Sequence, residues 1–142
     1  MPAHIVQKTI TIRATAEQVW DALTNPEKTK QYFFKSRVYS EWKPGSPIVF
    51  KGKFLLLFPF EMKGTVLEVQ PQKLLKYILK NNRSSSISTV TDALSYNNGI
   101  TTLSVTDDVG TGEGAAKRYQ RSDKGWDKVL SGLKKLLESQ VR

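Results

Sequence analysis

The chain of 142 residues contains no cysteine and a single histidine, His4. The missing cysteines exclude disulfides, thiolate catalysis and cysteine-ligated zinc or iron–sulfur sites. A single histidine also disfavours a transition-metal site. We therefore expect neither a metal nor a cofactor, and any acid–base chemistry would have to use Asp, Glu, Lys or Tyr side chains.

Long apolar runs are missing as well. No stretch approaches the roughly 20 apolar residues that cross a bilayer. The N-terminal residues MPAHIVQKTI lack the basic start and apolar core of a signal peptide. These absences predict a soluble, cytoplasmic protein with no membrane partner.

Charge of one sign dominates, because 22 basic residues face 13 acidic ones and give a formal net charge of +9. Nucleic-acid binding would need basic residues interleaved with exposed aromatic ones on one surface, and only the short KRYQR at 117–121 has this character. We interpret the charge as a solvated basic face and expect no nucleic-acid partner. The length and the 39% of hydrophobic residues predict one domain over residues 1–142.

The N-terminal part predicts a strand followed by two short helices. Ile5–Ala14 alternates apolar and polar residues, except that Lys8 falls on the apolar face. A bulge or a rim position would explain Lys8, and a lysine pointing into a cavity is the alternative. Thr15 and Gln18 have capping-box spacing for the first helix. Asn25-Pro26-Glu27 ends that helix and begins the next one, which finishes with three aromatic residues.

From Ser36 to Asp108 the pattern has a period of two and indicates antiparallel strands joined by short turns. Pro44-Gly45 favours a type II turn, and NNG at 97–99 is a strong hairpin signal. In the strand from Ser86 to Tyr96 we expect one face to carry small side chains: Thr89, Thr91, Ala93 and Ser95.

The last element is a predicted helix from about Gly114 to Glu138, roughly 37 Å long. Its apolar stripe comprises Ala116, Tyr119, Trp126, Val129, Leu130, Leu133, Leu136 and Leu137. A meander of six or seven strands curls, and its concave face needs a cover. The sequence therefore predicts an α+β, helix-grip fold: a curved antiparallel sheet wrapped around a long C-terminal helix. The two short helices after the first strand would support one wall of the space between them.

The segment GTGEG at 110–114 has only a superficial likeness to a phosphate loop. It lacks the Lys-Ser/Thr ending of a P-loop and the spacing of the dinucleotide fingerprint. We interpret it as a flexible connection before the last helix.

Acidic residues give little support for catalysis. Glu17, Asp21, Glu27, Glu68, Asp107 and Asp108 mostly fall at caps, turns or outward positions. Glu41 and Glu61 would point inward only if a bulge shifted the register. We find no nucleophile–base pair, so the sequence favours binding over an enzyme.

Aromatic and apolar residues on the predicted inner faces favour a binding cavity, which is mostly apolar in such proteins. The candidate ligand-binding residues are Trp20, Phe33, Phe50, Phe54, Met62, Tyr77, Thr89, Thr91, Trp126 and Leu130. The alternative is that these residues only fill the core. Small residues facing the helix, including Gly52 and Gly64, would leave space unless large side chains reach across.

The stretch FKGKFLLLFPF, residues 50–60, is apolar on both sides near Pro59, because Leu55 and Leu57 continue the face of Lys51 and Lys53. Such patches mark interfaces or ligand openings. The tip would form a lid over the cavity or a homodimer contact. Alternatively, it packs under the second helix.

Four segments together resemble a known family: TAEQVWDALTNPEKTKQYF, WKPGS before FKGKF, GTVLEVQPQKLLKY, and GWDKVLSGLKKLLE. Over residues 5–139 the chain is similar to the START-like (SRPBCC) helix-grip superfamily, in the branch named for the activator of the heat-shock chaperone ATPase. The resemblance implies a deep apolar cavity between sheet and helix. Members of the superfamily bind lipids, sterols or polyketides, and a few catalyse cyclisation or dehydration.

The leading expectation is therefore binding of a small hydrophobic molecule, lipid-like or polyketide-like. The second is a co-chaperone-like module of the stress response whose partner is a chaperone ATPase. The third is an enzyme of the cyclase or dehydratase kind.

Overall fold

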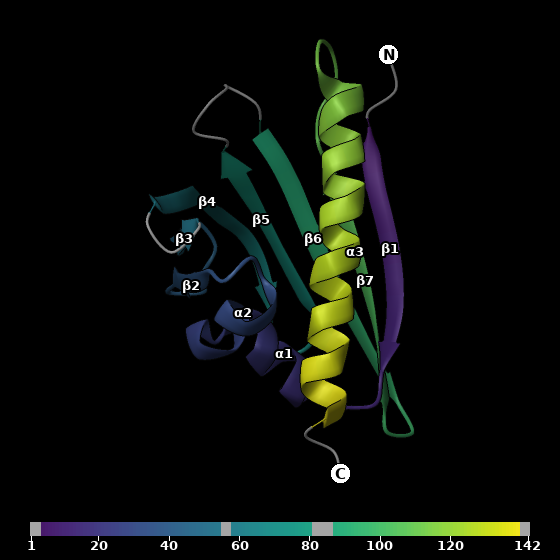
Figure 1. The fold of residues 1–142 in the computed structure, drawn as a ribbon. Helices are drawn as coiled ribbons and strands as arrows, with labels where there is room; N and C mark the ends of the chain where they lie inside the picture. The colour runs from purple at the N-terminus through teal and green to yellow at the C-terminus, as the bar shows by residue number, and fades with distance from the viewer. Residues whose placement is uncertain (1–3, 55–57, 81–86, 140–142) are drawn as a thin grey trace.

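The computed structural model describes residues 4–54, 58–80 and 87–139. Within these ranges seven antiparallel strands form one sheet in the order β1-β7-β6-β5-β4-β3-β2, and three helices accompany it (Figure 1). The elements are β1 Ile5–Ile12, α1 Ala16–Thr24, α2 Pro26–Tyr32, β2 Arg37–Ser40, β3 Pro47–Phe54, β4 Phe58–Gln70, β5 Leu74–Lys80, β6 Ile87–Asn97, β7 Ile100–Asp108 and α3 Ala115–Ser139. This order confirms the predicted α+β, helix-grip fold.

The edge strand β1 attaches α3 to the sheet. It ends at Ile12, two residues before the predicted end at Ala14. Lys8 sits on the helix side, where its Nζ lies 2.7 Å from an Asp123 carboxylate oxygen and 3.0 Å from one of Asp127. These hydrogen bonds raise the pKa of Lys8. The rim interpretation of Lys8 is therefore confirmed, and a helix acid pair explains why a lysine occupies this face.

Two backbone contacts continue the attachment toward the C-terminus of α3. Lys134 Nζ donates to the carbonyl oxygen of Thr11 at 2.9 Å. The backbone N–H of Arg13 donates to Glu138 Oε2 at 3.0 Å. In Figure 1 α3 runs beside β1 for much of its length, and these polar contacts hold the helix along that edge.

The predicted start signals of both short helices are confirmed. The Gln18 N–H donates to Thr15 Oγ1 at 3.1 Å, and the Thr15 N–H donates to Gln18 Oε1 at 2.8 Å, which completes the capping box. Asn25 Oδ1 accepts from the Glu27 N–H at 2.9 Å. Pro26 then occupies the first turn of α2, where its missing N–H costs nothing.

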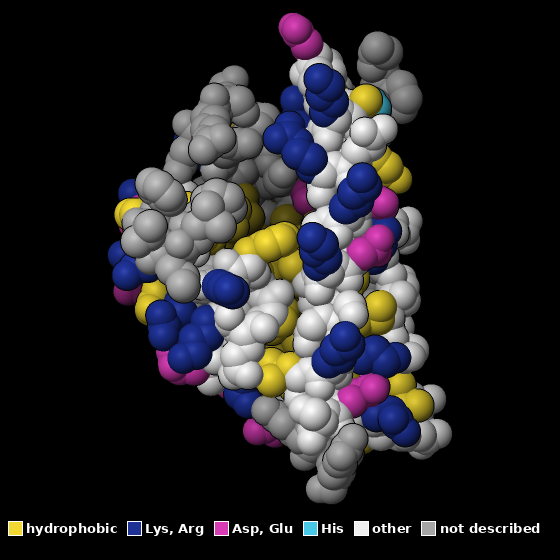
Figure 2. All heavy atoms as spheres, in the orientation of Figure 1, with side chains coloured by type: hydrophobic (Ala, Val, Ile, Leu, Met, Phe, Trp, Pro, Cys, Tyr) yellow, Lys and Arg dark blue, Asp and Glu magenta, His cyan; other side chains and the backbone are white. Residues whose placement is uncertain are grey.

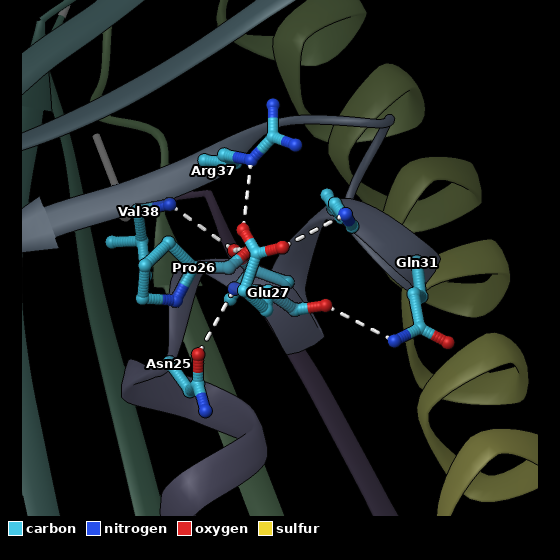
Figure 3. Close-up of polar contacts among 8 residues, drawn as sticks. Asn25, Pro26, Glu27, Gln31, Arg37 and Val38 are labelled. Atoms are coloured by element: carbon cyan, nitrogen blue, oxygen red, sulfur yellow. Dashed lines mark hydrogen bonds and ion pairs between the residues drawn. The ribbon is translucent and has the colours of Figure 1, made fainter.

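Side-chain contacts hold α2 on β2 (Figure 3). The Glu27 carboxylate accepts from Lys30 at 2.9 Å and from Arg37 at 3.1 Å. The buried Thr29 hydroxyl accepts from the backbone N–H of Val38 at 3.1 Å. The exposed ion pairs contribute little, whereas the Thr29 contact satisfies a buried strand N–H.

Tyr32 joins both short helices to α3. Its hydroxyl donates to the carbonyl oxygen of Ala22 in α1 at 2.6 Å. A Cβ atom at Gly132 of α3 would lie 3.1 Å from the Tyr32 Cβ, so glycine permits this close approach. Through these contacts of Tyr32, the two short helices support one wall of the space between the sheet and α3, as predicted.

Both predicted turns have the required backbone. Asn98 and Gly99 have φ values of 51° and 84°, as a two-residue hairpin turn with both central residues at positive φ needs. Gly45 has a φ of 87°, as the third position of a type II turn needs.

The helix α3 buries the predicted stripe with one change. Ala115 is buried whereas Ala116 is exposed, because Ala115 shares the face of Trp126, Val129 and Leu133 and the next residue is turned about 100° away from it. The other buried residues of α3 are Trp126, Val129, Leu130, Leu133 and Leu137. Tyr119 and Leu136 pack partly buried against the same core.

The glycine-rich loop before α3 presents carbonyl groups to a cation. Gly110, Gly112 and Gly114 all have positive φ, between 81° and 86°. The Arg118 guanidinium donates to the carbonyl oxygens of residues 109, 111 and 113 at 2.9, 3.3 and 3.0 Å. A phosphate loop presents N–H groups instead, so this geometry agrees with the rejection of a phosphate site.

Removing the Thr29 hydroxyl should destabilise the fold. Thr29→Val keeps the side-chain volume but leaves the buried Val38 N–H without its acceptor, which should lower the free energy of unfolding by about 1–3 kcal/mol. Thr9→Val on the exposed face of β1 is the matched control and should stay within about 0.5 kcal/mol of the parent. Urea denaturation measures both, and equal effects would contradict the assigned role of Thr29.

Candidate functional site

The deep interior between the sheet, α2 and α3 is nearly full. A small cavity of about 20 Å³ remains there, which is room for about one water molecule. It is lined by Leu23, Thr29, Tyr32, Phe33, Trp42, Ile48, Phe50, Leu75, Tyr77, Asp92, Leu103, Val105, Trp126, Val129, Leu130 and Leu133. The predicted deep cavity is thus packed by large side chains at this point.

An aromatic cluster is part of this packing. The rings of Phe33 and Phe50 stack with centroids 4.7 Å apart. Trp126 meets Phe33 edge-on at 5.8 Å, and Tyr77 lies 6.1 Å from Phe50. The cluster therefore joins residues from α3, β3, β5 and the segment after α2. Its central ring, Phe33, comes from the segment after α2.

A larger open cleft lies between the N-terminal half of α3 and strands β4 to β7. Its volume is about 450 Å³. It is lined by Phe33, Phe34, Phe60, Glu61, Met62, Leu79, Lys80, Ser88, Val90, Asp107, Val109, Arg118, Arg121, Ser122, Gly125, Trp126 and Val129. Figure 2 shows hydrophobic side chains in a hollow beside the α3 column.

Three side chains separate the cleft from the small inner cavity, because Phe33, Trp126 and Val129 line both. Phe33 and Trp126 are buried and in edge-to-face contact. These two rings form the floor of the cleft on one side and the boundary of the inner cavity on the other.

The predicted site residues divide between these two spaces. Phe33, Phe50, Tyr77, Trp126 and Leu130 line the inner cavity, and Met62 lines the cleft together with Phe33 and Trp126. Trp20 is partly buried against the core and lines neither space. The side chain of Phe54 and the hairpin-tip residues Leu55 and Leu57 lie outside the described residues.

The predicted inward direction of Thr89 and Thr91 is wrong. Side chains alternate along a strand, and Val90, Asp92 and Leu94 are the buried residues of β6. Val90 and Asp92 line the two spaces, whereas Thr89 and Thr91 line neither. The large apolar residues at positions 90 and 94 are the signal in the sequence that indicates the true inner face.

The small residues also have another role than the predicted one. A Cβ at Gly64 would lie 1.6 Å from the carbonyl oxygen of Ile78, so glycine permits β4 and β5 to approach. A Cβ at Gly52 would lie 2.8 Å from the Phe60 ring. Gly52 and Gly64 therefore allow close packing of neighbouring groups and do not line the cleft.

Two inward carboxylates were missed. Asp107, predicted at an outward or turn position, lines the cleft and is 6% exposed. Its Oδ2 accepts hydrogen bonds from Ser122 Oγ at 2.7 Å and Trp126 Nε1 at 3.1 Å. Asp92 lines the inner cavity and is 3% exposed. One carboxylate oxygen of each, Oδ1, has no hydrogen-bond partner among the described residues.

Burial first, and then the charge of Asp107, raises the pKa of Asp92 to about 7. A carboxyl group with this pKa exchanges its proton near neutral pH. The Ser122 hydroxyl donates to Asp107, and histidine is absent from the described residues that line the cleft. Within the described ranges no group of three or more His, Asp or Glu residues could hold a metal ion.

The comparisons with known proteins agree with this geometry. The family model described as Activator of Hsp90 ATPase homolog 1-like protein matches residues 13–138. The chain belongs to this family. The expected resemblance is confirmed, and with it the helix-grip fold. No curated protein matches the sequence at a significant level.

Solved structures share the fold. The solution structure of ChR145 from Cytophaga hutchinsonii is 33% identical, with a TM-score of 0.75 and 99% of each chain covered. MLL2253 from Mesorhizobium loti is 22% identical, with a TM-score of 0.80 and coverage of 95% of this chain and 97% of that one. DynU16, a protein of the dynemicin biosynthetic locus, is 20% identical, with a TM-score of 0.76 and coverage of 98% of this chain and 49% of that one.

None of the helices in the described part of the chain is both long and apolar enough to span a membrane. The chaperone partner, the homodimer and the cytoplasmic location stay predictions.

Asp92 should make stability depend on pH in a predictable direction. The pKa in the folded protein is about 7 and the ordinary value is 3.8, so the folded state binds the proton more tightly. The unfolded chain ionises first as the pH rises, and stability falls between about pH 4 and pH 7, by up to about 4 kcal/mol. Asp92→Asn should remove this loss.

The measurement is the free energy of unfolding of the parent and Asp92→Asn at several pH values. The difference between the two proteins isolates Asp92, because the other titrating groups are shared. A difference that does not change between pH 4 and pH 8 would contradict the raised pKa.

Proposed function

We propose that this protein binds a small hydrophobic molecule in the cleft between α3 and strands β4 to β7. The observation that carries the proposal is the volume of about 450 Å³ beside a packed core, since ligand pockets commonly span about 300–1,000 Å³. Apolar side chains line much of it, among them Phe60, Met62, Leu79 and Val109.

The position of the cleft refines the expected binding mode. Among the predicted residues, Phe33, Met62 and Trp126 would contact the ligand directly. Phe50, Tyr77 and Leu130 would act from behind, because they pack the inner cavity under the shared floor. Membership of the family and the fold shared with DynU16, a protein of a biosynthetic locus, support a ligand-binding domain.

Blocking the cleft tests the proposal. Ser88 lines the cleft and Thr89 lies on the opposite face of the same strand. Ser88→Trp should fill part of the cleft and lower the affinity for the neutral apolar probe N-phenyl-1-naphthylamine by about tenfold or more. A tenfold change corresponds to a loss of about 1.4 kcal/mol of binding free energy. Thr89→Trp should leave the affinity within about twofold of the parent. Fluorescence titration measures both.

A second readout uses stability. A ligand present at 100 times its dissociation constant should stabilise the parent by about 2.7 kcal/mol, and Ser88→Trp should show much less stabilisation. If the parent neither binds the probe nor gains stability, ligand binding in the cleft is wrong. Equal loss in both tryptophan variants would place the probe elsewhere.

The family match favours one alternative function, stimulation of a chaperone ATPase. Such an activity would use the surface of the protein rather than the cleft. Ser88→Trp should then stimulate the ATPase activity of the partner as strongly as the parent protein does. If the parent protein does not stimulate the ATPase, this alternative is wrong. The same variant therefore separates the two functions.

A further inference from the structure

The carboxylate of Asp107 lies in the cleft without a cationic partner among the described residues. It accepts hydrogen bonds on Oδ2 from two neutral donors, Ser122 and Trp126, and Oδ1 accepts none from the described residues. Buried carboxylates in folded proteins are normally paired with a cation or fully hydrogen-bonded. This unused acceptor is buried and belongs to a residue that lines the cleft, so a donor that reaches the floor of the cleft would satisfy it.

Asp92 adds a second buried carboxyl group on the same face of the sheet. Asp107 of β7 pairs with Val90 of β6, and Asp92 pairs with Val105, so the two carboxyl groups occupy neighbouring inward positions. Asp92 Oδ1 also lacks a hydrogen-bond partner in the described part of the chain. Because both carboxyl groups are buried, their interaction with a charged ligand is stronger than it would be in solvent.

The cations of the cleft do not neutralise this charge. Lys80, Arg118 and Arg121 line the cleft, but among the described residues none lies within ion-pair distance of Asp107 or Asp92. The Arg118 guanidinium donates its hydrogen bonds to three carbonyl groups of the loop before α3. Lys80 and Arg121 are exposed. Positive charge thus lies at the solvent side and negative charge at the buried side.

We propose that the cleft selects an apolar molecule that carries a protonated amine, and that the amine donates hydrogen bonds to Asp107. This inference rests on the proposed function and adds the class of ligand. An ammonium group brings both the missing donors and the missing positive charge, whereas a hydroxyl group brings only a donor. A ligand carboxylate at the same depth would meet two buried carboxyl groups. The apolar body would lie against Phe33, Met62 and Leu79, which line the same cleft.

Three probes of equal chain length test the head group. Decylamine, decanol and decanoate compete with N-phenyl-1-naphthylamine for the full chain at pH 7.4, at concentrations below micelle formation. We expect decylamine to bind about tenfold or more tightly than decanol, and decanoate most weakly, since a hydrogen bond to a charged group is worth more than a neutral one.

Asp107→Asn identifies the responsible group. It should reduce the preference for decylamine over decanol to about twofold or less. Glu68→Gln removes the same charge from an exposed position on β4 and should keep the full preference. Near-ultraviolet circular dichroism checks that both variants are folded, and the ranking in the parent stands whether or not a variant folds.

The outcomes separate this inference from the proposed function. If decanol displaces the naphthylamine probe but decylamine binds no more tightly, or if decanoate binds best, the amine preference is wrong and ligand binding stands. If Glu68→Gln loses the preference as Asp107→Asn does, the effect is general attraction and the assignment to Asp107 is wrong. If no probe binds the parent, both proposals fail.

Discussion

The sheet of this protein is much wider than the helix that covers it, and the rest of the structure depends on this difference in width. Seven strands spaced about 4.8 Å apart make a sheet roughly 29 Å wide, whereas a helix with its side chains is about 10 Å across. The single helix α3 cannot cover that concave face, even though the sheet curls around it (Figure 1). The protein covers the β1 side with α3 and one end with α1 and α2. The remaining corner, next to β4 and β5, is the cleft.

The aromatic cluster sets how deep this uncovered corner reaches. Phe33 lines both the cleft and the small inner cavity, together with Trp126 and Val129, and so forms part of the boundary between them. Phe33 follows α2 directly, and α2 is fixed by Thr29 on β2 and by Tyr32 against α1 and α3. Helix capping at Asn25 therefore influences the floor of the cleft through a short chain of contacts.

Local signals were strong enough to predict most of the fold from the sequence. The capping box at Thr15, the Asn25-Pro26 helix start and the Asn98-Gly99 turn each depend on a few neighbouring residues. The site was less predictable, because it depends on which face of β6 is buried. A strand with small residues on one face and Val90, Asp92 and Leu94 on the other is ambiguous until neighbouring strands are paired. The resulting choice of Thr89 and Thr91 also concealed Asp92. Asp107 was hidden because its partners, Ser122 and Trp126, come from a distant helix.

A row of polar contacts holds α3 along one edge of the sheet. Lys8, the Thr11 carbonyl and the Arg13 N–H fasten the helix along β1, whereas the cleft separates its N-terminal half from β4 and β5. One edge of the helix is therefore held on β1 by polar contacts, whereas β4 and β5 lie across the cleft from it. Substitutions at the residues of β4 and β5 that line the cleft would change its shape without touching the polar contacts that hold α3 on β1.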